Sequence, residues 1–250
     1  MPADTNTTVA DCFMPCSKPS LTIYRADTMA FVTFEGIDGS GKTTQARRLV
    51  AALDERDIQV VAAKEPDGGH IGGEIRQILV EQRERALDAY EEALLVSAAR
   101  YDHVRSVVRP ALDAGIWVVC DRFVDSTFAF QVFENRVAEP FFDVVSSHVI
   151  GQTRPDITFI LDLDAEAAMR RRDEGDSARH TDPAEAHRNF GRIRRGLLEA
   201  ARRDPQRCHV IDATGDEEGI ATQILDILRA AGHLRAAAVQ AHRSTPRSMR

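Results

Sequence analysis

The chain has 250 residues, of which 43% are hydrophobic and 28% are charged, a composition that supports one sizeable core. Its formal net charge is −7 at pH 7, which argues against a broad nucleic-acid-binding surface. No apolar stretch approaches the roughly 20 residues that cross a bilayer, and the first residues show no secretory signal pattern. We therefore expect a cytoplasmic protein whose partners are neither nucleic acids nor membranes.

The two ends of the chain differ in composition from its middle. Residues 1–29 are polar and contain three prolines, so we predict a disordered extension there. Residues 235–250 form a basic tail that we also expect to be disordered, which leaves one domain over residues 30–234. The four cysteines show no CxxC pair and no His–Cys ligand spacing, so we expect reduced thiols and no zinc site.

Strand and helix patterns alternate from the start of this domain. Asp88 and Glu91 have the spacing of a capping box at the start of a long helix. The continuous apolar run at 116–120, which ends at Asp121, is typical of a parallel strand covered on both faces. In chain order we predict strand 31–34, helix 44–53, strand 59–63, helix 72–83, helix 88–114 and strand 116–120.

The second half of the chain repeats this alternation. In chain order we predict a helix from Ser126, helix 140–150, strand 157–162, helix 165–172, helix 184–203, strand 209–212 and helix 217–231. Five strands that alternate with helices predict an α/β fold with a five-stranded parallel sheet and helices on both faces. Ligands of such sheets bind at the carboxyl ends of the strands, so we look for the site there.

The glycine-rich segment 36–43 matches G-x-x-x-x-G-K-[ST], the phosphate-binding loop of P-loop proteins. Its glycines allow backbone N–H groups to point at a polyphosphate, while Lys42 adds positive charge and Thr43 offers its hydroxyl to Mg²⁺. A chance match in an ordinary turn is the alternative, which the flanking strand and helix disfavour. The predicted ATP-binding residues of this segment are Gly36, Asp38, Gly39, Ser40, Gly41, Lys42, Thr43 and Thr44.

Further segments carry a more specific signal. Residues 35–44 match E-G-x-[DE]-G-x-G-K-[ST]-T, residues 154–162 match R-P-D-x-T-x-x-L-D and residues 211–213 match I-D-A. Residues 64–69 stand in the place of R-E-P-G-G-T, and residues 121–131 follow D-R-[YFH]-x-x-S-T-x-A-Y-Q except at Phe130. Together these motifs resemble the thymidylate kinase family over about residues 31–234. The resemblance implies a P-loop NTPase-type fold with an arginine-bearing lid at about residues 170–183.

The resemblance also implies an activity, namely phosphorylation of thymidine monophosphate (dTMP to dTDP) with ATP and Mg²⁺. Transfer between two phosphates needs in-line positioning and positive charge rather than a strong base. The family is generally a homodimer, and the long helix from Asp88 offers a candidate surface for one.

The family motifs assign roles to individual residues. Lys42 and Arg122 are the implied catalytic residues, Asp121 joins Thr43 as a metal-binding residue, and Ala213 belongs to the ATP site. Arg122 and Arg76 are assigned to the acceptor phosphate. The full set of implied acceptor-binding residues is Asp38, Glu65, Pro66, Arg76, Val96, Arg100, Arg122, Ser126, Thr127, Phe130 and Gln131.

Each of these assignments has a plainer alternative. Asp121 and Arg122 could form a local salt bridge at a strand end. Arg76 could be a solvated helix residue, and Asp38 could simply stabilise the turn. For the whole chain, the alternative is a non-catalytic nucleotide-binding module, against which Lys42 and Arg122 argue.

Arginines cluster after the fourth predicted strand, at residues 170–172 and at Arg179. Some members of the family carry a catalytic arginine inside the phosphate-binding loop, at the position that Gly39 occupies here. The resemblance therefore implies that a lid arginine supplies this charge, and Arg171 and Arg179 are our candidates. The alternative is a solvated run of charge on a helix end.

The expected base pocket departs from the family pattern. Val96 and Arg100 share one helix face, and Arg100 matches the arginine that hydrogen-bonds the thymine carbonyl. Val96 stands where a phenylalanine usually stacks on the base, a contact worth roughly 1–3 kcal/mol. Phe130 replaces a tyrosine near the sugar, and Asp67 alters the loop after the second strand. Neutral drift in a dTMP kinase is one explanation; an acceptor such as 5-hydroxymethyl-deoxyuridine monophosphate (5-hydroxymethyl-dUMP) is the other.

Overall fold

The computed structural model describes residues 29–81, 85–174 and 188–235. Within these residues, five parallel strands form one sheet in the order β2-β3-β1-β4-β5. The strands are β1 (Phe31–Glu35), β2 (Val60–Lys64), β3 (Trp117–Asp121), β4 (Ile157–Asp162) and β5 (Cys208–Asp212). The predicted sheet is confirmed, and its strand ends differ from the predicted ones by no more than one residue.

The central strands are apolar because both of their faces are covered. β1 and β3 are buried along their whole length, whereas the edge strand β2 is only partly covered. The parallel register brings the carboxyl ends to one edge of the sheet, where Phe34 pairs with Asp121 and Glu35 pairs with Ile160. Side chains that follow β1 and β3 are therefore neighbours.

Helices surround the sheet. They are α1 (Lys42–Asp54), α2 (Gly72–Val80), α3 (Ala89–His103), α4 (Arg109–Asp113), α5 (Val124–Thr127), α6 (Glu139–Ile150), α7 (Ala165–Glu174), α8 (Phe190–Arg203) and α9 (Glu217–Ala230). Two π-helical segments, η1 (Val104–Val108) and η2 (Phe128–Glu134), continue α3 and α5. In the parts of the chain that the structure describes, no helix combines the length and apolar character needed to span a membrane.

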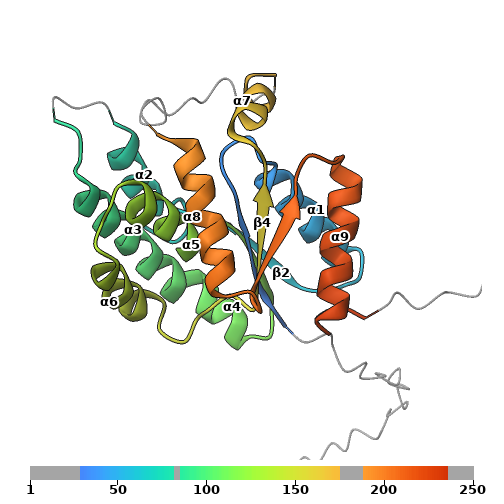
Figure 1. The fold of residues 1–250 in the computed structure, drawn as a ribbon. Helices are drawn as coiled ribbons and strands as arrows, with labels where there is room; N and C mark the ends of the chain where they lie inside the picture. The colour runs from blue at the N-terminus through green and yellow to red at the C-terminus, as the bar shows by residue number, and fades with distance from the viewer. Residues whose placement is uncertain (1–28, 82–84, 175–187, 236–250) are drawn as a thin grey trace, which may run out of the picture.

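Figure 1 shows α1 and α9 on one side of the sheet and α3, α6 and α8 on the other. On the first side, Leu49 of α1 and Ile224 of α9 belong to the larger hydrophobic cluster of the domain. On the second side, Val104 and Val108 of η1 belong to a smaller cluster with Phe31. Helices thus cover both faces of the sheet.

Two predicted helix boundaries are wrong by three residues or more. Three others are wrong by two residues: α1 begins at Lys42 rather than at residue 44, α5 begins at Val124 rather than at Ser126, and α7 ends at Glu174 rather than at residue 172. α2 ends at Val80 because Glu81 adopts an extended conformation with φ −66° and ψ 132°. α8 begins at Phe190 rather than at residue 184, because Asn189 has non-helical dihedrals and its side chain accepts a hydrogen bond from the Arg192 N–H. Residues 184–187 lie outside the described part of the chain.

The predicted capping box at the start of α3 is confirmed. The Asp88 carboxylate accepts from the N–H groups of Tyr90 and Glu91 at 2.8 and 2.9 Å, and Glu91 returns a hydrogen bond to the Asp88 N–H at 2.8 Å. These bonds satisfy donors that the first turn of a helix leaves without partners.

We expect Asp88→Ala to lower the free energy of unfolding by about 1 kcal/mol, because the variant leaves those N–H groups without their acceptor. Urea unfolding monitored by circular dichroism measures the change. Asp113→Ala, at an exposed aspartate of α4, is the matched control. Equal destabilisation of the two variants would contradict a role for the capping box.

Candidate active site

The loop between β1 and α1 folds as its glycines require. Gly36 has φ +149°, and a Cβ atom there would lie 2.4 Å from Ser40 Oγ and 2.8 Å from the Leu161 carbonyl oxygen. A side chain at this position would therefore force the loop away from the end of β4. The loop leads directly into the first turn of α1, which begins at Lys42, and this is where helix N–H groups can meet phosphate.

Lys42 lies inside the loop rather than in solvent. Its Nζ atom donates to the Ile37 carbonyl at 2.9 Å and lies 3.4 Å from Asp38 Oδ1, and the side chain is only 6% exposed. Burial and the nearby charge of Arg122 lower the pKa of Lys42, while the charge of Asp38 acts in the opposite direction. A polyphosphate bound at this position would add negative charge beside Lys42 and favour its charged form.

The two predicted metal-binding residues lie in direct contact. Thr43 Oγ1 donates to Asp121 Oδ2 at 2.5 Å, which joins the first turn of α1 to the end of β3. Asp121 Oδ1 is buried and has no hydrogen-bond partner among the described residues. A hydroxyl beside a carboxylate with a spare oxygen suits Mg²⁺, which takes few protein ligands and keeps phosphates and waters in its shell.

Arg122 bridges the ends of β1 and β3. Its side chain donates to Asp38 Oδ1 at 2.5 Å, to the Gly36 carbonyl at 3.2 Å and to Ser126 Oγ at 3.1 Å. Its backbone has φ +70°, a left-handed conformation that is uncommon for residues other than glycine. These contacts place Arg122 against the phosphate-binding loop.

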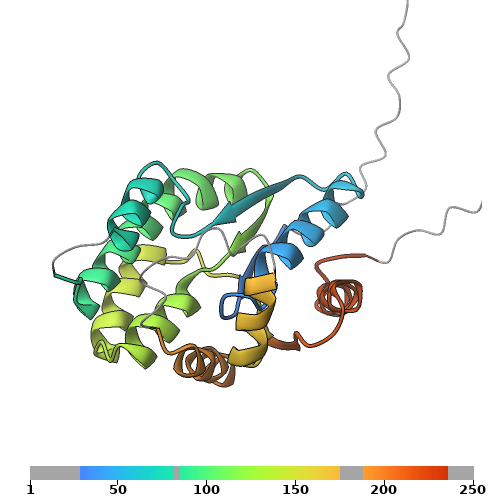
Figure 2. The ribbon, with the colours of Figure 1, turned by 90° about the horizontal axis from the view of Figure 1, so that it is seen from above.

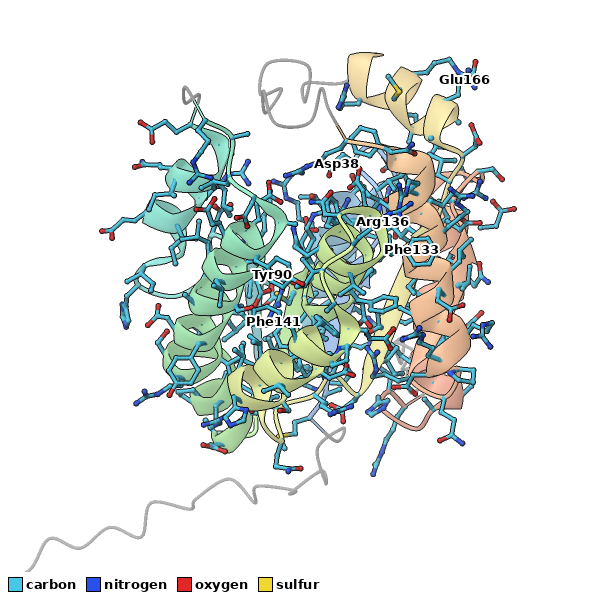
Figure 3. The ribbon with its side chains drawn as sticks, turned by 60° about the vertical axis from the view of Figure 1, so that its left-hand side comes forward. Asp38, Tyr90, Phe133, Arg136, Phe141 and Glu166 are labelled. Carbon is cyan, nitrogen blue, oxygen red and sulfur yellow. The ribbon has the colours of Figure 1, made fainter. Side chains whose placement is uncertain are left out.

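Asp38 is the carboxylate that these cations share. Although burial acts in the opposite direction, the charges of Arg122 and Lys42 hold the pKa of Asp38 well below its usual range. Figure 3 shows Asp38 between the α2 and α3 side of the molecule and the α7 and α8 side. This carboxylate therefore keeps the cations in place near the centre of the candidate site.

Glu35, at the end of β1, is a site residue that the sequence analysis did not identify. Its buried carboxylate accepts from the Phe123 N–H at 2.8 Å, from the Ser126 N–H at 3.2 Å and from Ser126 Oγ at 2.5 Å. It thus fixes the turn that carries Arg122. Burial and the negative charge of Asp125 raise the pKa of Glu35 to about 7. The signal that could have found it is an acidic residue at the end of an otherwise apolar strand.

A second polar cluster joins Glu65, Arg100 and Thr127. Arg100 donates to Glu65 at 2.7 Å, to Thr127 Oγ1 at 2.8 Å and to the Phe123 carbonyl at 2.9 Å, and it is 2% exposed. His103 Nδ1 lies 3.0 Å from the other oxygen of Glu65. The structure therefore brings three predicted acceptor-binding residues together. A contact from Arg100 to a thymine carbonyl stays a prediction.

The remaining predicted acceptor residues are more dispersed. Arg76 pairs with Asp67 at 3.5 Å and is 42% exposed, so its role at the acceptor phosphate stays a prediction. Val96 on α3 is half-buried. Phe130 is buried beside Arg122, whose guanidinium carbon lies 5.2 Å from the ring centre, whereas Gln131 donates to Glu92 at 3.3 Å.

The structure also explains why residue 39 is a glycine. A Cβ atom at Gly39 would lie 2.1 Å from the Ala168 carbonyl oxygen of α7. Figure 2 shows α7 over the loop that joins β1 to α1. An arginine at this loop position would therefore require α7 to move.

The candidate lid arginines are only partly described. Arg171 donates to the Ala213 carbonyl at 2.8 Å and to the Thr214 carbonyl at 3.3 Å, which joins α7 to the segment after β5. Arg170 pairs with Glu166 at 3.0 Å, and Figure 3 shows Glu166 pointing away from Asp38. Arg179 lies outside the described residues.

These features define the class of protein. A phosphate-binding loop at the carboxyl edge of a parallel sheet, with an Asp-Arg pair after a neighbouring strand, is the site of a P-loop phosphotransferase. Residues 34–224 match the family described as thymidylate kinase.

Individual relatives agree with this match. A thymidylate kinase of Symbiobacterium thermophilum is 38% identical over 194 residues, which are 78% of this chain and 90% of that protein. One of Nitrobacter hamburgensis is 40% identical over 202 residues, 80% of this chain and 87% of that protein. The crystal structure of thymidylate kinase from Ehrlichia chaffeensis superposes with a TM-score of 0.65 at 32% identity, covering 80% of this chain and 98% of that one. The chain belongs to the thymidylate kinase family.

The raised pKa of Glu35 predicts a pH-dependent stability. Between the unfolded pKa of 4.5 and the folded pKa of about 7, the folded state binds more protons than the unfolded state, so stability falls as pH rises. We expect the free energy of unfolding to fall by on the order of 3 kcal/mol from pH 4.5 to pH 8 through this residue. Glu35→Gln should remove most of that fall, because an amide does not titrate, while its oxygen can still accept from the N–H groups of Phe123 and Ser126.

Urea unfolding over this pH range, for the wild type, Glu35→Gln and Glu55→Gln at an exposed control position, measures the effect. An undiminished fall in Glu35→Gln would show that another group controls it.

Proposed function

We propose that this protein transfers the γ-phosphoryl group of ATP to dTMP and releases dTDP and ADP. The observation that carries this proposal is the ion-paired cluster of Lys42, Asp38 and Arg122, which sets a phosphate-binding lysine beside an arginine at the ends of two adjacent strands. The family match supports dTMP as the acceptor. The chain is thus a nucleoside-monophosphate kinase.

In this proposal the loop and Lys42 bind the donor phosphates, and Arg122 binds the acceptor phosphate. Thr43 and Asp121 would hold Mg²⁺, which neutralises charge on the β- and γ-phosphates. The acceptor is already mostly dianionic near neutral pH, so the residues act by positioning and by opposing charge repulsion rather than by proton abstraction. Glu35 holds the turn that carries Arg122 through its hydrogen bonds to the N–H groups of Phe123 and Ser126.

The family also supports two further proposals. We propose a cytoplasmic homodimer in which α3 supplies part of the interface. Tyr90, Leu94 and Tyr101 of this helix are large side chains that are 43%, 52% and 45% exposed in the single chain. Light scattering at micromolar concentration tests the dimer, and a monomer mass would contradict it. We retain residues 30–234 as the proposed boundaries of the kinase domain.

A coupled assay of ADP release across nucleoside monophosphates tests the activity. We expect the highest specificity constant for dTMP or for 5-hydroxymethyl-dUMP. Activity confined to adenylate, guanylate or cytidylate would contradict the substrate class. ATP binding without transfer to any monophosphate, in a folded preparation, would instead support a non-catalytic module.

Two substitutions separate the donor side from the acceptor side. We expect Lys42→Ala to reduce kcat by at least about a hundredfold without unfolding the protein, because this lysine acts on phosphate charge. Arg122→Ala should raise KM for dTMP more than KM for ATP. Steady-state kinetics with each substrate varied, together with circular dichroism, provide the measurement. If both variants changed only KM for ATP, the assignment of Arg122 to the acceptor would be wrong.

The departure at Val96 predicts a change in acceptor preference. Val96→Phe should add a stacking surface worth roughly 1–3 kcal/mol and favour dTMP over a bulkier 5-substituted acceptor by up to about a hundredfold. Overpacking can offset part of this gain.

The measurement is the ratio of kcat/KM for dTMP to that for 5-hydroxymethyl-dUMP. Val144→Phe, at a position of α6 that is 60% exposed, is the control. A ratio that stays constant in Val96→Phe would show that this position does not contact the base.

A further inference from the structure

Phe130 lies beside two guanidinium groups rather than one. The guanidinium carbon of Arg122 lies 5.2 Å from the centre of the ring, and that of Arg188 lies 5.0 Å from it. The two carbons are therefore no more than about 10 Å apart. We propose that Arg188 binds the phosphate of the acceptor nucleotide together with Arg122. This inference rests on the proposed kinase function and adds a residue that the family motifs did not identify.

The backbone around Arg188 is held against η2. The N–H of Asn189, the next residue, donates to the Glu134 carboxylate at the end of η2, and the Asn189 side chain caps α8 through the Arg192 N–H at 2.9 Å. These contacts fix the start of α8. The Arg188 side chain reaches the ring of Phe130 in η2.

The helix that follows packs closely on the same segment. A Cβ atom at Gly196 would lie 2.8 Å from Phe133 Cβ and 2.9 Å from Ala129 Cα. The backbones of α8 and η2 are therefore too close for any side chain at residue 196. Figure 3 shows Phe133 beside α8. Arg188 therefore lies just before a helix that packs closely on η2.

Three cations, namely Arg122, Lys42 and Arg188, act on Asp38. Burial opposes ionisation of Asp38, but the charges of Arg122, Lys42 and Arg188 together hold its pKa low. Glu134 also faces Arg188. Burial raises the pKa of Glu134, although the hydrogen bond from the Asn189 N–H and the charge of Arg188 act in the opposite direction. Asp121 and Glu35 also act on Lys42 and Arg122. A phosphate monoester, which carries about −1.5 to −2 charge at pH 7, would meet three cations here.

The acceptor phosphate fits Arg188 better than the donor phosphates do. Arg188 shares Phe130 with Arg122, whereas Lys42 lies inside the loop and donates to the Ile37 carbonyl. The predicted partner of Arg122, Arg76, is paired with Asp67 in this chain. Two guanidinium forks that converge on one phosphate also give the directional, charge-assisted hydrogen bonds that a lysine lacks.

The test compares binding of dTMP with binding of thymidine, which has no phosphate. By isothermal titration calorimetry, we expect Arg188→Ala to weaken dTMP binding by about tenfold or more and to leave thymidine binding unchanged. Arg188→Lys should restore part of the loss, because it keeps the charge but not the fork. In kinetics, KM for dTMP should rise while KM for ATP changes by less than about twofold. Arg195→Ala, at an exposed arginine of α8, is the control and should match the wild type.

Equal losses for dTMP and thymidine in Arg188→Ala would show a structural role and overturn the inference. So would unchanged dTMP binding in Arg188→Ala alongside a loss in Arg122→Ala, which would leave the proposed function intact. A wild type that neither binds nor phosphorylates dTMP would overturn the proposed function, and the inference with it.

Discussion

The candidate site depends on a carboxylate that is hidden beneath it. Glu35 ends the central strand and accepts two backbone N–H groups and one hydroxyl from the turn after β3. That turn holds Arg122 in a left-handed conformation. Without an acceptor at this point, two buried N–H groups would lose their partners, a penalty of about 1–3 kcal/mol for each group. Both this buried contact and the ion pair with Asp38 hold Arg122 beside the loop.

Much of the fold could be predicted from the sequence because its signals are local. The capping box at Asp88 and the apolar run that ends at Asp121 each specify their own element. The start of α8 could not be predicted in the same way. It is set by Asn189, whose N–H bonds to Glu134 in a segment distant in the chain, and helical spacing does not report such a contact. The sequence pattern therefore extended the helix too far.

The site shows the same division. The positions of Lys42, Thr43 and Asp121 follow from a loop of fixed spacing and from the edge where parallel strands end. The partners of Arg76 and Arg188 are harder to predict, because a long arginine side chain can reach several different charged groups. Asp67, an acidic residue in a loop where the family has glycine, pairs with Arg76 and is one such group. Motif matching assigns a residue to a position, but it does not show which charge the side chain will meet.

The contact between Gly39 and Ala168 restricts how this site can change over time. In families of this kind a positive charge can occupy either the phosphate-binding loop or a neighbouring helix. Here the carbonyl of Ala168 fills the space that any side chain at residue 39 would need. A single substitution in the loop would therefore displace α7 before it could supply a useful charge. A positive charge inside the loop of this chain would therefore require changes in both segments.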